Sequence, residues 1–166
     1  MPPKRSPKKS ARKSKTVKVS SIADTQIKRL ATATGNERVS MDVYYTVRTA
    51  LSDHMDKIIS KIVTLKQRLH KQTVDAKIVE DVINERRLRS RIVSVIPQTT
   101  FKRMVKQWLA MHESKSRVTD EANQKLQRYA ENFLNELFEK AGSIRIYKRR
   151  KTLYEEDVIQ ALEAIK

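Results

Sequence analysis

The chain has 166 residues, among them no cysteine, two glycines and four prolines. Without cysteine it can form neither a disulfide scaffold nor a thiolate zinc site. Pro97 is the only proline beyond residue 7, so residues that break regular structure are scarce. No apolar run is long enough to cross a bilayer, and we expect no membrane partner. Because a sustained two-residue alternation is also missing, the sequence predicts an all-α fold.

The motifs of catalysis are missing too. There is no nucleophile elbow, no glycine-rich phosphate loop and no spaced pair of carboxylates. The histidines His54, His70 and His112 are scattered without the spacing of metal ligands. We therefore expect no enzymatic activity, no metal and no cofactor.

Positive charge dominates what is present. The formal net charge is +17, and residues 1–20 carry eight cations and no carboxylate. Proline, serine and few apolar residues in that segment predict a disordered basic tail rather than a secretory signal. Such a charge favours a polyanionic partner.

Two long helices are predicted beyond the tail, because apolar residues recur there at steps of three and four. We expect them over residues 41–69 and 120–141. A short amphipathic helix should precede each of them, and another should follow at 74–84 and at 153–165. The predicted order beyond the tail is therefore a short helix, a long helix and a short helix, and this order occurs twice.

The body also contains an internal repeat. Arg38 precedes Thr73 by 35 positions, and Arg117 precedes Thr152 by the same number. The two segments superpose without a gap at an offset of 79 residues. A long helix flanked by short ones cannot bury its own apolar stripe, so we expect the second copy to lie across the first.

The stretch RRKTLYEEDV (149–158) separates its charges sharply. Thr152 is predicted to cap a helix that begins after it, with Glu155 completing a capping box. Three cations directly before a helix N-terminus are unfavourable unless an external anion lies there. The stretch therefore predicts an anion-binding loop.

The two copies resemble histones. IKRLATATGNERVSMDVYYTVRTAL in the first is similar to histone four, whereas FKRMVKQW and NELFEKAGSIRIYKRRKT in the second are similar to histone three. This order resembles the histone doublets of large DNA viruses; fused archaeal histones match less well. The resemblance implies two histone folds in tandem that form an intramolecular handshake pseudo-heterodimer. The first fold would span residues 21–84, a basic linker 85–98, and the second fold 99–166.

A handshake would place Arg38 beside Thr152 and Arg117 beside Thr73. The arginines would then enter minor grooves while the threonines hold flanking phosphates. Cations near the starts of the short first helices would hold the central turn of DNA. The DNA-binding residues implied are Lys28, Arg29, Arg38, Lys71, Thr73, Lys102, Arg103, Arg117, Arg150, Lys151 and Thr152.

The resemblance also implies a clamp and an interface between copies. Arg150 and Asp157 match the family's Arg–Asp clamp, whereas the first half lacks the acid at the corresponding position. Tyr147 replaces a histidine that bonds a partner's aspartate, so its hydroxyl should reach Asp157 of a second copy. Gly142 could bend the long helix within this surface, which spans about residues 137–161.

The implied function is that of a core-histone-like protein that wraps and compacts double-stranded DNA into nucleosome-like particles. We expect self-association through the second fold and a histone-two-type doublet or dimer as a further partner. The implied location is chromatin, in the nucleus or viral factory of an infected cell and in the virion. Three alternatives stay open: a histone-fold subunit of a transcription or replication complex, an archaeal-type chromatin protein, and a basic RNA-binding protein.

Overall fold

The computed structural model describes residues 21–83, 95–112 and 116–165. The predicted tail and most of the predicted linker lie outside these residues. The described elements follow the order α1 (Asp24–Ala33), β1 (Arg38–Val39), α2 (Met41–Arg68), β2 (Thr73–Val74), α3 (Ala76–Val82), α4 (Gln98–His112), β3 (Arg117–Val118), α5 (Asp120–Tyr147), β4 (Thr152–Leu153) and α6 (Glu155–Ile165). The fold is mostly helical, as predicted.

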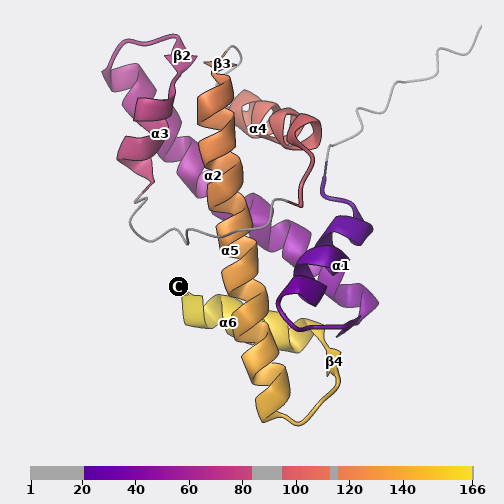
Figure 1. Cartoon of the computed structure of the whole chain (residues 1–166). Helices are drawn as coiled ribbons and strands as arrows, with labels where there is room; N and C mark the ends of the chain where they lie inside the picture. The colour runs from indigo at the N-terminus through magenta and orange to yellow at the C-terminus, as the bar shows by residue number, and fades with distance from the viewer. Residues whose placement is uncertain (1–20, 84–94, 113–115, 166) are drawn as a thin grey trace, which may run out of the picture.

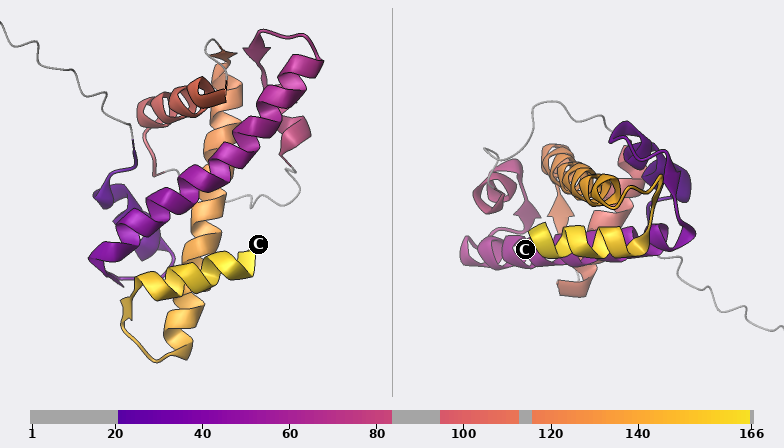
Figure 2. Two further views of the ribbon diagram at one scale, coloured as in Figure 1. Left: turned by 180° about the vertical axis from the view of Figure 1, so that it is seen from behind. Right: turned by 90° about the horizontal axis from the view of Figure 1, so that it is seen from below.

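The two long helices, α2 and α5, cross each other (Figures 1 and 2). Each has 28 residues, and both boundaries of α5 lie 79 positions after those of α2. The strands β3 and β4 follow β1 and β2 by the same offset. His70 and Arg149, also 79 apart, both have a positive φ, of 51° and 55°. The predicted repeat is therefore confirmed at the level of the backbone.

The halves are joined at both ends of the crossed helices by pairs of parallel strands. β1 pairs with β4, which sets Arg38 opposite Thr152. β2 pairs with β3, which sets Thr73 opposite Arg117. Both predicted neighbours are confirmed. Each strand pair contains one strand from each half, so the strands of either half are paired only when the other half is present.

One hydrophobic core runs through both halves. It contains the inward stripes of α2 and α5 together with apolar residues from every other helix. Burying a large apolar side chain stabilises the fold by roughly 1.5–3 kcal/mol. His54 of α2 stacks on Phe133 of α5, with ring centroids 3.9 Å apart. Burial lowers the pKa of His54, and nearby Lys57 lowers it further, which favours the neutral imidazole.

The segments before α1 and α4 are held by corresponding positions of the long helices. Arg48 Nε donates to the carbonyl of Ile22 at 2.8 Å. Gln127, 79 positions later, donates through Nε2 to the carbonyl of Ile96 at 2.6 Å. The buried carboxylate of Glu131 accepts from the Ile96 amide at 3.0 Å and from the preceding amide at 3.1 Å. These charge-assisted bonds fix where the second half begins.

Four predicted helix boundaries are wrong, one of them the end of α3, which lies at Val82 rather than at residue 84. α5 continues to Tyr147 instead of ending at residue 141, and Gly142 lies inside it. α3 and α6 begin at residues 76 and 155, because Val74 and Leu153 before them belong to strands. Val74 and Leu153 also fit the helical spacing of apolar residues, but pairing with a strand of the other half places them in strands.

Thr152 is not the cap of α6, contrary to prediction. It lies in β4, three residues before the helix begins at Glu155. The Tyr154 amide donates instead to Oδ2 of Asp157 at 3.1 Å. Glu155 accepts a hydrogen bond from Thr46 Oγ1 at 2.8 Å and so ties α6 to α2. The capping carboxylate is therefore Asp157.

Candidate nucleic-acid interface

The paired strands direct polar side chains outward at both ends of the molecule. Successive side chains of a strand point to opposite faces. Arg38 and Arg117 are exposed, whereas the second residue of each of these strands packs on the core. Thr73 and Thr152 are half-buried beside them. Each end of the crossed pair thus presents one arginine and one threonine.

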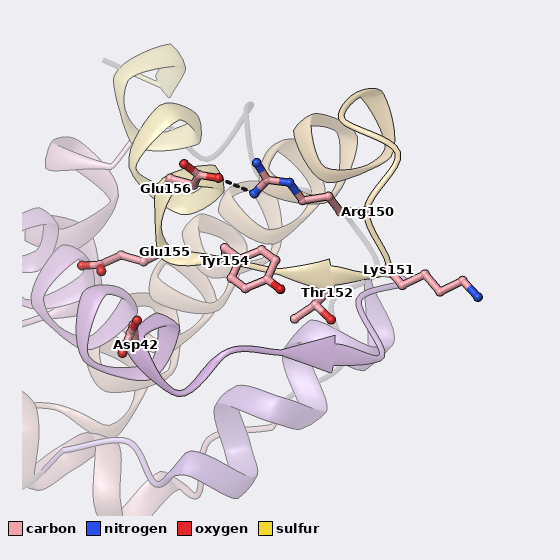
Figure 3. A pocket seen from close by; sticks show the side chains of 7 residues that line it. All are labelled: Asp42, Arg150, Lys151, Thr152, Tyr154, Glu155 and Glu156. Atoms are coloured by element: carbon pink, nitrogen blue, oxygen red, sulfur yellow. Dashed lines mark hydrogen bonds and ion pairs between the residues drawn. The ribbon is translucent and has the colours of Figure 1, made fainter.

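The two cations of the loop before β4 point in different directions: Arg150 bonds a carboxylate, whereas Lys151 does not face one in Figure 3. Lys151 extends away from the molecule, and Asp42, Glu155 and Glu156 lie on the far side of Tyr154 and Thr152 (Figure 3). All six of these residues, together with Arg150, line a hollow of about 630 Å³. A second hollow, of about 330 Å³, is bounded by Gly35, Glu37, Arg38, Arg145 and Lys151. This second hollow brings Lys151 of the loop before β4 together with Arg38 of β1.

The predicted clamp between Arg150 and Asp157 has different partners in the structure. Lys148 Nζ lies 3.1 Å from Asp157 Oδ1, and the Asp157 side chain is fully buried. Arg150 bonds Glu156 instead, which raises the pKa of the Arg150 guanidinium and lowers that of the Glu156 carboxyl. The chain turns sharply through Arg149, and Lys148 rather than Arg150 reaches the buried acid.

The burial of Asp157 also corrects the predicted bond between copies. Its two carboxylate oxygens already accept from Lys148 and from the Tyr154 amide. With no exposed surface, Asp157 is not available to Tyr147 of a second copy. Tyr147 itself is 89% exposed and Ile146 is 66% exposed. The surface therefore offers apolar contact rather than the predicted hydrogen bond.

The β2 end carries a different ion pair. Lys71 Nζ lies 2.8 Å from Asp75 Oδ2, and Asp75 Oδ1 caps α3 by accepting from the Ile78 amide at 3.0 Å. The bond from Lys71 lowers the pKa of Asp75, and the bond from the Ile78 amide lowers it further. The Lys71 ammonium carries three donors, so a phosphate contact would share this cation with Asp75.

The predicted central cations lie on α1 and α4. Lys28, Arg29 and Arg103 are exposed. Lys102 is exposed too, but it pairs with Asp120 at 2.8 Å and lowers the pKa of that carboxyl. Both helices begin on the same side of the crossed pair (Figures 1 and 2). The four cations can therefore contribute to one surface.

The sequence reading missed two residues that hold the loops. Arg145 donates to Asn36 Oδ1 at 3.1 Å, to the Arg150 carbonyl at 3.0 Å and to the Gly35 carbonyl at 3.3 Å. Lys66, 79 positions earlier, is buried and donates to Ser116 Oγ at 2.8 Å, next to Arg117. Both are basic residues at the same position of the repeat. Comparing the two copies position by position could have identified them.

Gly142 allows the loop before β1 to approach α5 closely. A Cβ at this position would lie 2.9 Å from Asn36 Oδ1 and 3.2 Å from Nδ2. Asn36 is fully buried, and its Nδ2 donates to the Phe138 carbonyl at 3.1 Å. The side chain therefore has little room to move.

We predict that Gly142→Ala lowers the free energy of unfolding by about 1–2 kcal/mol, although alanine favours helix. Thermal melting should show the loss. In an Asn36→Ala background the same substitution should be neutral or stabilising, because the contact is gone. A stabilising effect in the parent chain would contradict the close contact.

A family model of the core histone domain, which describes histones two-A, two-B, three and four together, matches residues 79–164, slightly more than half of the chain. The chain belongs to the core histone family. Histones of this family are DNA-packaging proteins rather than enzymes. No curated protein matches the sequence.

A solved structure gives the fold a second support. The histone from Methanopyrus kandleri superposes with a TM-score of 0.66 and 20% sequence identity. The match covers 84% of this chain and 92% of that one, so one archaeal chain is similar across both halves. Both halves of this histone thus share the arrangement of a known histone structure.

The described part of the chain adds two negative findings. None of its helices is both long and apolar enough to span a membrane. It also contains no group of three or more His, Cys, Asp and Glu side chains that could hold a metal ion.

Proposed function

We propose that this histone is a doublet that wraps and compacts double-stranded DNA into nucleosome-like particles. Its histone-four-like half (21–84) and histone-three-like half (99–166), joined by the linker 85–98, would form an intramolecular handshake pseudo-heterodimer. The pairing of each loop with a loop of the other half supports this reading. DNA binding itself is the function expected of a core histone domain.

The observation that carries the proposal is the pair of exposed arginines, one at each end of the crossed helices. A helix of 28 residues is about 42 Å long. Arg38 lies just before α2, and Arg117 pairs with Thr73 just beyond its end, so roughly the length of one helix separates the two arginines. Each would enter a minor groove that faces the protein, with the cations of α1 and α4 holding the DNA between them. Such contacts read backbone shape and give little base specificity.

The proposed partners follow from the exposed ends of the two halves. The end of α5 and α6 expose Ile146, Tyr147 and Ile159, and a second copy would pack on this face. A histone-two-type doublet or dimer would join through the first half, near residues 65–84. The proposed location is viral chromatin, in the nucleus or viral factory and in the virion.

An archaeal-type chromatin protein is the second candidate. The similarity to the Methanopyrus kandleri histone over both halves favours it. Both candidates package DNA, and they differ in whether a separate histone-two-type partner extends the particle. Nuclease protection with this chain alone distinguishes them: a doublet pair gives one discrete length, whereas an archaeal-type polymer gives a ladder.

We predict that Arg38→Ala and Arg117→Ala each weaken binding to duplex DNA about tenfold and shorten the protected length. Both side chains are exposed, so melting without DNA should change by less than about 0.5 kcal/mol. Lys140→Ala removes the same charge from α5, where Lys140 pairs with Glu136, and should change protection little. If either arginine variant melted far below the parent, that arginine would be structural.

A further inference from the structure

Arg145 connects the two loops that form the β1–β4 pair. Its Nε and Nη2 donate to Asn36 and Gly35, in the loop before β1. Its Nη1 donates to the carbonyl of Arg150, in the loop before β4. One guanidinium thus bonds both chain segments just before Arg38 and Thr152 come together. This three-way contact is here called the bracket.

The bracket depends on the shape of arginine. A guanidinium holds its donors in a rigid plane, whereas a lysine ammonium is a point charge on a flexible stem. The Asn36 oxygen that Arg145 meets belongs to a fully buried side chain, and the other two acceptors are backbone carbonyls. These acceptors cannot follow a shorter or differently shaped donor. Lysine would keep the charge and lose at least part of the bracket.

We infer that Arg145 is a positioning residue, which sets Arg38 in register with Thr152 and Lys151 for entry into the minor groove. The inference rests on the proposed function. Arg145 acts through the loop: its three donors already have acceptors within the chain, whereas Arg38 is exposed. The hollow bounded by Gly35, Arg38, Arg145 and Lys151 lies where this register is set.

The other end of the molecule supplies an internal reference. There Lys66 occupies the matching position of the repeat and bonds Ser116 beside Arg117. A substitution of Arg145 should therefore act on the Arg38 end and leave the Arg117 end unchanged. A general loss of stability would affect both ends alike.

The first test needs no DNA. The Ser40 amide donates to the Leu153 carbonyl at 2.9 Å at the Arg38 end, and the Thr119 amide donates to the Val74 carbonyl at 3.1 Å at the other end. In Arg145→Lys, hydrogen exchange of the Ser40 amide should be about tenfold faster, while that of Thr119 stays within about twofold. Asn36→Ala should act in the same direction. Equal acceleration of both amides, or of neither, would overturn the bracket.

The second test couples the bracket to DNA binding. Arg145→Lys should weaken binding to a short duplex about fivefold, without changing the salt dependence, because the charge is kept. In an Arg38→Ala background the further loss should be under about twofold, whereas in an Arg117→Ala background it should stay near fivefold. Arg128→Lys, at an exposed arginine of α5, is the matched conservative control. Equal losses in both backgrounds would overturn the positioning role.

The two tests separate the two claims. Suppose that Arg145→Lys accelerates exchange of the Ser40 amide but Arg38→Ala leaves DNA binding unchanged. The bracket is then a structural contact only, and both the DNA contact of Arg38 and the positioning role of Arg145 are wrong. If Arg38→Ala weakens binding and the Arg145 and Arg38 effects are additive, the DNA contact stands and the positioning inference fails.

Discussion

Raising monovalent salt from about 50 to about 200 mM should weaken binding to duplex DNA by roughly four to five orders of magnitude. Each phosphate neutralised by a cation releases counterions, and log K falls by about 0.9 per phosphate on a log salt scale. The two strand-pair ends and the first turns of α1 and α4 can engage about eight to ten phosphates, which gives a slope of roughly −7 to −9. Titrations at several salt concentrations measure it.

The ion pairs within the interface make the slope informative. Lys71, Lys102 and Arg150 each pair with a carboxylate of this chain. If those pairs persist on DNA, the three cations neutralise no phosphate, and the slope should be less negative than the predicted range by up to about three units. A slope near zero would show that phosphate contacts do not lead binding, and a strong preference for one sequence would favour a protein-binding subunit instead.

Phe138→Ala should lower the free energy of unfolding by about 3–5 kcal/mol, because it opens a cavity in the common core. The side chain is fully buried in α5, and the backbone carbonyl of Phe138 accepts from Asn36 of the other half. For a domain of this size the melting temperature should fall by about 10 °C. Ile146→Ala, on the exposed side of the same helix, should cost only a few tenths of a kcal/mol.

The shape of the melt tests the fold itself. Both strand pairs and the core join the two halves, so parent and variant should each unfold in one cooperative transition. Calorimetry and circular dichroism should agree on its midpoint. Two separate transitions, of which Phe138→Ala moves one, would show that the halves fold independently.

The loop arginines and threonines could be found without a structure, because a repeat is a property of the sequence. The offset of 79 aligns Arg38 with Arg117 and Thr73 with Thr152, and each arginine lies beside the threonine of the other half. Ion pairs were less predictable. Arg150 faces Glu156 rather than Asp157, since the partner depends on how the chain turns between α5 and β4.

Local patterns in the sequence determined the helices, the repeat and the crossing of two copies. Spacing of apolar residues acts over three or four positions, and an unburied stripe requires a partner. Only the tertiary structure decided that Val74 and Leu153 join strands, that Asp157 is buried beneath Lys148, and that Arg145 bonds two loops at once. The strand pairs and the bonds from Arg145 to Gly35 and Asn36 join segments far apart in the chain, and the partner of Asp157 depends on how the chain turns between α5 and β4. Hydrogen bonds form or fail over a few tenths of an ångström, which no pattern in the sequence specifies.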